Sequence, residues 1–169
     1  MKKINWGIIG LGDIAQSFSD GFLNCDNARL LAVSSNKNEK LNQFKNNFEL
    51  KKEYLFNNYE DLIKCEDVDI VYIALPNNLH FQWIMKCIQE NKNILIEKPA
   101  VRNFTEAKKI EKEIIDRNLF FSEGYMYRYY PQIKKVIEIL KTDQLGKLIS
   151  METTFSNNLL FEKKFFFFK

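Results

Sequence analysis

A glycine-rich loop near the start of the chain has the residues that phosphate binding requires. The segment Gly10-Leu11-Gly12-Asp13-Ile14-Ala15 has the pattern GxGxxA, and it follows an apolar run and opens an expected helix. The first glycine permits a tight turn, the second lets the backbone approach a pyrophosphate, and Ala15 allows close helix–strand packing. The helix N-terminus offers free N–H groups and partial positive charge. The loop predicts a dinucleotide site, and the alternative is a glycine turn of the kind that occurs in any doubly wound fold.

The end of the second expected strand bears on the choice of nucleotide. A site that selects NAD usually has an Asp or Glu there, which binds the ribose 2′-hydroxyl. Here the stretch reads Ser34-Ser35-Asn36-Lys37-Asn38, and the first acid is Glu39. Hydroxyls, an amide and a lysine suit a 2′-phosphate better than a bare ribose, so NADP is favoured over NAD. The alternative is that Lys37 is a solvated loop residue.

A lysine follows the fifth expected strand, in the segment Glu97-Lys98-Pro99. Ligands in open α/β sheets bind beyond the carboxyl ends of the strands, so we expect Lys98 at the mouth of the nucleotide cleft. A lysine there can hydrogen-bond a substrate hydroxyl or relay its proton during hydride transfer, a role that requires a pKa lowered by burial or neighbouring charge. The alternative is a surface lysine paired with Glu97.

These residues would be positioned by an alternation of strands and helices. Near-continuous apolar strands that alternate with amphipathic helices indicate a parallel sheet covered on both faces and joined by right-handed crossovers. The sequence therefore predicts an α/β, Rossmann-like, doubly wound parallel sheet. The expected strands are 4–9, 29–34, 53–56, 70–75, 93–97 and 119–122, and the expected helices are 13–23, 38–47, 59–65, 79–90 and 103–117.

The residue composition of the sequence changes near Ser122–Gly124, where we expect a domain boundary. An aromatic and basic stretch at 125–130 precedes a helix that opens at Pro131. The helix has apolar residues expected to face inward, and a half-buried strand is expected over 148–155. The apolar residues of the helix are Ile133, Val136, Ile137 and Leu140.

Composition excludes several functional classes. The 169 residues are 46% hydrophobic and 28% charged, with a net charge of +3, which does not suggest a nucleic-acid partner. No apolar run approaches the ~20 residues of a membrane helix. Three cysteines without a CxxC and a single histidine predict neither a disulfide framework nor a metal site, and they favour a cytoplasmic setting.

Three segments together resemble the glucose–fructose oxidoreductase / inositol dehydrogenase / rhizopine-catabolism (Gfo/Idh/MocA) family. They are Trp-Gly-Ile-Ile-Gly-Leu-Gly-Asp-Ile-Ala at 6–15, Ala-Leu-Pro-Asn-Asn-Leu-His at 74–80 and Ile-Glu-Lys-Pro at 96–99. The likeness continues through 123–131 and 146–149 and covers roughly residues 4–156. It is greatest to the branch of sugar oxidoreductases and dihydrodiol dehydrogenases. The resemblance implies a nicotinamide enzyme that transfers hydride to or from a sugar, polyol or cyclic diol.

The resemblance also implies roles for individual residues. Glu97 and Lys98 match the catalytic motif, with Lys98 as substrate anchor and proton partner. His80 is implied at the nicotinamide ribose, and the alternative is a structural role at a helix start. Arg128 is implied close to the nicotinamide, and the alternative is stacking on neighbouring tyrosines. The remaining cofactor positions are Gly10, Gly12, Asp13 and Ile14 at the pyrophosphate, Ser35, Asn36 and Lys37 at the adenosine ribose, and Pro76 and Asn77 near the nicotinamide ribose.

The resemblance divides the chain into a nucleotide-binding domain at 1–122, a truncated start of an α+β substrate domain at 123–158, and a low-complexity tail at 159–169. Family members are roughly twice as long, oligomerise through the part that is missing here, and have a second catalytic histidine there. We therefore expect an NAD(P)-dependent oxidoreductase impaired by truncation. One alternative is an inactive nucleotide-binding remnant, and another is a protein–protein module that uses residues 125–130.

Overall fold

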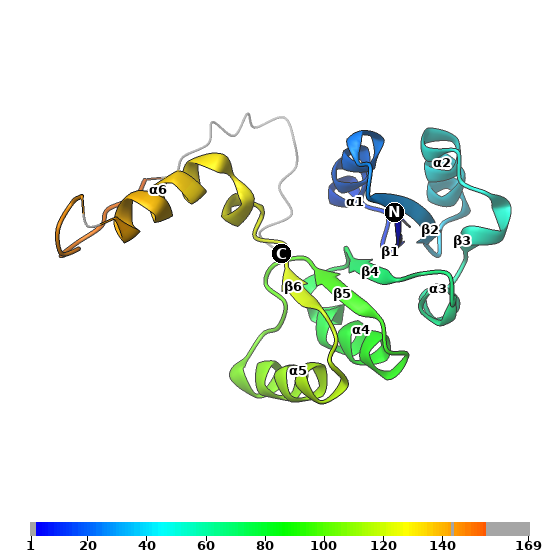
Figure 1. Ribbon diagram of the computed structural model, residues 1–169. Helices are drawn as coiled ribbons and strands as arrows, with labels where there is room; N and C mark the ends of the chain where they lie inside the picture. Colours follow the sequence, from blue (N-terminus) through cyan, green and yellow to red (C-terminus); the bar gives the residue numbers. More distant parts are fainter. Residues whose placement is uncertain (1–2, 143, 155–169) are drawn as a thin grey trace. The chain divides into compact units, whose positions relative to one another are not determined.

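A computed structural model describes residues 3–142 and 144–154 of the chain. The chain divides into two units, the first ending at Tyr125 and the second beginning at Met126. Figure 1 labels the α-helices and the strands. Among the described residues, no helix is both long enough and apolar enough to cross a membrane.

The first unit is built on one parallel sheet of six strands in the order β3-β2-β1-β4-β5-β6. This order confirms the predicted α/β, Rossmann-like fold. The chain leaves β1 toward one edge and returns beside it with β4, so the order reverses between these two strands. The strands are β1 (Ile4–Ile9), β2 (Ala28–Ser34), β3 (Leu55–Phe56), β4 (Ile70–Ile73), β5 (Asn93–Ile96) and β6 (Phe121–Glu123).

Helices cover both faces of this sheet (Figure 1). Strand side chains alternate between the faces, so Ile8 joins one hydrophobic core and Ile9 joins the other. Residues of α1 and α2 fill the core that contains Ile8, and residues of α3, α4 and α5 fill the core that contains Ile9. The helices of this unit are α1 (Asp13–Asp20), η1 (Gly21–Asn24), α2 (Asn38–Phe48), η2 (Lys52–Tyr54), α3 (Tyr59–Lys64), α4 (Asn77–Gln89) and α5 (Phe104–Arg117), where η denotes a 3-10 helix.

Two large apolar residues in the first turns of helices are exposed. The helix predicted over 13–23 is α-helical only to Asp20 and ends in a 3-10 turn, η1. Phe18 and Phe22 pack on Trp6, whereas Ile14 is 41% exposed because it lies in the first turn, at the rim of the sheet. Phe104, the first residue of α5, is 75% exposed.

The second unit contains η3 (Met126–Tyr129) and α6 (Pro131–Lys141). The helix begins at Pro131 as predicted, but its apolar residues Val136, Ile137 and Leu140 are exposed, so the expectation that they face inward is wrong. The strand predicted over 148–155 is absent from its described part, residues 148–154. A strand needs a partner for its backbone hydrogen bonds, and the described residues of this unit include none. Residue 155 and the predicted tail at 159–169 lie outside the described residues.

Candidate functional site

The candidate site lies at the carboxyl ends of the central strands. Backbone hydrogen bonds continue the sheet one residue past these ends, from Ala74 N to the carbonyl of Ile9 at 3.0 Å and from Glu97 N to the carbonyl of Ile73 at 3.1 Å. Gly124 N donates in the same way beyond β5 and β6, at 2.8 Å. The loops that follow these strands are thus fixed in register. The loops after β1 and β4 flank the reversal of strand order, which is the usual ligand crevice of a doubly wound sheet, and the loops after β5 and β6 follow along the same end of the sheet.

The two glycines of the GxGxxA loop differ in their surroundings. Gly10 has φ +88°, and a Cβ there would lie 2.5 Å from the carbonyl oxygen of Ala74, so only glycine fits. Gly12 has φ −87° and is exposed, and a Cβ there would meet no atom within 4 Å. The fold therefore explains Gly10 but not Gly12.

Gly12 is also the N-cap of α1, and no side chain caps that helix. Behind the loop, Ala15 is fully buried, so α1 packs closely on the sheet, while Asp13 and Ile14 are exposed at its first turn. Uncapped N–H groups at a helix start attract an anion. Open space at Gly12 beside such a helix start fits a pyrophosphate that approaches the backbone, which is the group that the loop pattern predicts.

The turn between β2 and α2 presents polar groups without a carboxylate. Ser34 is buried, and its hydroxyl donates to the carbonyl of Phe56 at 3.0 Å. Ser35 is also buried, and its hydroxyl accepts from Lys37 N at 3.2 Å, which shapes the turn. Asn36 and Lys37 are exposed beyond it. Ser35, Asn36 and Lys37 can donate hydrogen bonds to a phosphate or to ribose hydroxyls.

We call residues 97–100, which follow β5, the Lys98 segment. The hydroxyl of Tyr72 donates to Glu97 Oε1 at 2.5 Å. Tyr72 is 1% exposed, and burial together with this carboxylate raises the pKa of its hydroxyl well above the ordinary value. A Cβ on Gly124 would lie 3.2 Å from the same carboxylate oxygen. The Glu97 side chain is therefore held between β4 and the end of β6.

Lys98 itself is exposed, and none of the described residues forms a hydrogen bond or ion pair with its side chain. The alternative in which Glu97 and Lys98 pair on the surface is therefore not the arrangement seen. Lys98 is joined to Pro99 by a cis peptide bond.

His80 lies in the first turn of α4 and is completely buried. Its Nδ1 is 2.8 Å from the carbonyl oxygen of Pro99, and its Nε2 is 2.7 Å from the carbonyl oxygen of Leu75. The imidazole thus links the loop after β4 to the Lys98 segment. Pro76 is the N-cap of α4, and Pro76 and Asn77 are exposed at the same rim. Arg128 belongs to the second unit, where it is exposed in η3, and its role remains a prediction.

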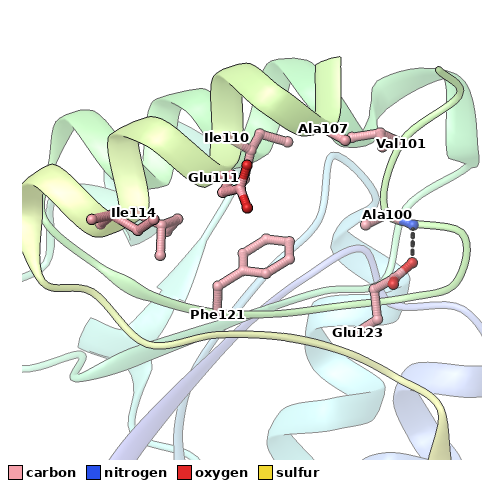
Figure 2. Close-up of a pocket in the computed structure, with 9 residues that line it drawn as sticks. Ala100, Val101, Ala107, Ile110, Glu111, Ile114, Phe121 and Glu123 are labelled. Carbon is pink, nitrogen blue, oxygen red and sulfur yellow. Dashed lines mark hydrogen bonds between the residues drawn. The ribbon is translucent and has the colours of Figure 1, made fainter. Parts of the chain in front are cut away.

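Sequence reasoning missed two residues of this region. Tyr72 carries a hydroxyl within the otherwise aliphatic strand β4, and this contrast is the only feature of the sequence that could have indicated a role for it. Glu123 ends β6, and its carboxylate accepts from Ala100 N at 2.7 Å, as drawn in Figure 2. Glu123 also lines an apolar groove of about 340 Å³ between α5 and β6. An acid next to Gly124 at a strand end gave no clear indication of this contact.

The glycine loop, the uncapped helix and the strand reversal define an α/β nucleotide-binding domain. Residues 4–125 match the oxidoreductase family Gfo/Idh/MocA, which is described by its NAD-binding Rossmann fold. The chain belongs to that family, as the sequence resemblance predicted. An oxidoreductase named P35 from Formosa agariphila is 32% identical over 152 residues, or 89% of this chain. A trans-1,2-dihydrobenzene-1,2-diol dehydrogenase from Bos taurus is 28% identical over 92% of it.

The chain spans about half the length of the curated relatives it matches, 47% in each of these two cases. Among solved structures, scyllo-inositol dehydrogenase from Lactobacillus casei with bound NAD(H) and scyllo-inositol superposes with a TM-score of 0.79 at 24% identity, over 86% of this chain and 43% of that one. A 3-ketoreductase from Actinomadura kijaniata in complex with TDP-benzene and NADP superposes with a TM-score of 0.77 at 26% identity, over 86% of this chain and 44% of that one.

Proposed function

We propose that the chain binds an NAD(P) dinucleotide across the carboxyl ends of β2, β1, β4 and β5, as the cofactor half of an oxidoreductase. The observation that supports this proposal is the open space at Gly12, next to an α1 N-terminus that no side chain caps. The pyrophosphate would lie on the N–H groups of Asp13 and Ile14. Family membership makes a nicotinamide dinucleotide the expected ligand.

We further propose a preference for NADP over NAD. Ser35, Asn36 and Lys37 would bind the adenosine ribose and its 2′-phosphate, since the turn offers donors and one cation but no carboxylate to accept from a ribose hydroxyl. Relatives divide on this point, because D-xylose 1-dehydrogenase of Hypocrea jecorina is named for NADP and the Lactobacillus casei enzyme was solved with NAD(H).

The proposed reaction is hydride transfer between a carbinol carbon of a sugar, polyol or cyclic diol and the nicotinamide. The names of relatives support this substrate class, which includes a xylose dehydrogenase and a dihydrobenzenediol dehydrogenase. The bound nicotinamide supplies the hydride acceptor or donor. In the direction of reduction, the Lys98 ammonium would hydrogen-bond the carbonyl oxygen and donate a proton to it. In the direction of oxidation, the neutral Lys98 amine would accept the proton of the carbinol hydroxyl. Glu97, held by Tyr72, would fix the backbone from which Lys98 extends.

We propose that residues 1–169 alone bind nucleotide but turn over substrate poorly. The relatives are about twice as long, and the positioning of a substrate supplies ~7–11 kcal/mol of a barrier in favourable cases. The second candidate, an inactive nucleotide-binding remnant, shares the glycine loop and differs only in turnover. Rapid sugar-dependent formation of NADPH by the purified chain would contradict both the proposal of poor turnover and the proposal of an inactive remnant.

Thermal unfolding in the presence of nucleotide tests the binding proposal. A ligand that binds only the folded state at about 100 times its Kd stabilises that state by about 2.7 kcal/mol. We therefore expect NADP(H) to raise Tm more than NAD(H) does at equal concentration, with glucose 6-phosphate as the control for a phosphate effect. Equal Tm shifts with the two dinucleotides would contradict the proposed preference for NADP. No shift with either dinucleotide would refute the proposed function.

A further inference from the structure

Two contacts hold the backbone that directly follows Lys98. On one side, the carboxylate of Glu123 accepts the N–H of Ala100 at 2.7 Å. On the other side, Nδ1 of His80 is 2.8 Å from the carbonyl oxygen of Pro99. Neither contact involves the Lys98 side chain. Together they join the Lys98 segment to α4 and to the end of β6.

We propose that Glu123 is a positioning residue of the nucleotide site, which acts through Ala100 to fix the position of Lys98. The inference rests on the proposed function, because it assumes that a dinucleotide occupies the crevice in front of this segment. Glu123 lies outside the residues that the glycine loop and the Lys98 motif single out.

The chemistry of the contact supports a positioning role. A carboxylate that accepts a backbone N–H forms a charge-assisted hydrogen bond, which is stronger than a neutral one. Glu123 is half-buried at the end of a strand, so its own backbone is fixed by pairing with Ile96 of β5. The exposed side chain of Lys98 has no partner among the described residues, so the reach of its ammonium group depends on its backbone.

The order of the strands indicates which half of a bound dinucleotide would depend on the contact between Glu123 and Ala100. Ser35 and Lys37 follow β2, on one side of the β1–β4 reversal, and Lys98 follows β5, on the other side. A dinucleotide that crosses the reversal would place its adenosine half at β2 and its nicotinamide half at β4 and β5. Loss of the Glu123 contact should therefore weaken binding of the nicotinamide half and leave the adenosine half unaffected.

The test compares Glu123→Ala and Glu123→Gln by calorimetric titration with NADPH and with 2′,5′-ADP, which contains only the adenosine half. For Glu123→Ala we expect the Kd of NADPH to rise about tenfold and that of 2′,5′-ADP to stay within about twofold. Glu123→Gln keeps an oxygen that can accept from Ala100 N, so it should restore most of the NADPH affinity. Glu123→Asp keeps the charge but shortens the side chain, so that the carboxylate no longer reaches Ala100 N. It replaces Glu123→Ala in the test if the alanine variant does not fold.

Glu111→Ala is the matched control, because Glu111 lines the same groove as Glu123 (Figure 2), and among the described residues its only ion pair is with Lys108 on the surface of α5. It should bind both ligands like the wild type. Equal weakening of both ligands by Glu123→Ala, or no weakening of either, would overturn the positioning role. Wild-type protein that binds neither ligand would instead refute the proposed function, and the inference would fall with it.

Discussion

The same added methyl group should leave the stability of the fold nearly unchanged at Gly12 and lower it at Gly10. Gly12→Ala introduces a Cβ into open space at φ −87° and ψ −174°, which any residue adopts. Alanine is a poorer N-cap than glycine, but it also reduces the freedom of the unfolded chain, which is worth about 0.4–1 kcal/mol in the other direction. The two effects oppose each other, so we expect the free energy of unfolding to change by less than about 0.5 kcal/mol.

Gly10→Ala should destabilise the fold. The positive φ of +88° costs a residue with a Cβ about 1–2 kcal/mol. The new Cβ would also lie 2.5 Å from the backbone oxygen of Ala74, a residue whose N–H donates a hydrogen bond to the carbonyl of Ile9. Because a backbone atom cannot move aside cheaply, we expect a total loss on the order of 3 kcal/mol.

Urea unfolding of both variants and nucleotide titration of Gly12→Ala check this reasoning. The Cβ at Gly12 would fill the space expected for the pyrophosphate, and overpacking of this kind costs about 1–3 kcal/mol, or roughly a 5- to 150-fold rise in Kd. A Gly12→Ala protein that binds NADP(H) like the wild type would refute the assignment of that space. A Gly10→Ala protein as stable as the wild type would refute the argument from φ and contact.

Three further predictions concern other residues. Tyr72→Phe removes a buried donor to Glu97 and should lower the free energy of unfolding by about 1.5–3 kcal/mol in urea titrations, and a change under about 0.5 kcal/mol would contradict this. Lys37→Gln should weaken NADPH about tenfold in calorimetry and leave NADH within about twofold, whereas equal effects would disfavour a 2′-phosphate contact. The hydrogen bond from Lys86 lowers the pKa of Glu60 below its ordinary value of 4.5. Its contribution is therefore present above pH 4.5 and lost as the pH falls through the lowered pKa, so the stability difference between wild type and Glu60→Gln should shrink on acidification, and a constant difference would argue against it.

The sheet was predictable because its signals are local. Continuous burial of strands such as Ile70–Ile73 follows directly from their composition, and the GxGxxA spacing placed the first loop between β1 and α1. The burial of side chains at helix starts, in contrast, could not be predicted from the local sequence. Ile14 and Phe104 have the spacing of residues on a buried helix face, yet both lie in first helical turns and are exposed. Periodicity reports a helix face but not where the neighbouring element ends.

The contacts around Lys98 could not be derived from spacing alone. Tyr72, His80 and Glu123 come from three elements and meet one short segment only because the register of parallel strands aligns their ends. The strand expected over 148–155 shows the same dependence, since an alternating pattern forms a strand only if a second strand is present to pair with it. Gly10 and Gly12 also look alike in sequence, and only the structure distinguishes the glycine that the fold requires.

The separation of the two loop groups by the β1–β4 reversal has a practical meaning for redesign. The turn at Ser35 and Lys37 bonds to Phe56, whereas the Lys98 segment bonds to His80 and Glu123. Sites that share no partner usually respond additively to substitution. Nucleotide preference could therefore be exchanged by rewriting the turn after β2 without disturbing the lysine, so that the two properties can evolve independently within one small domain.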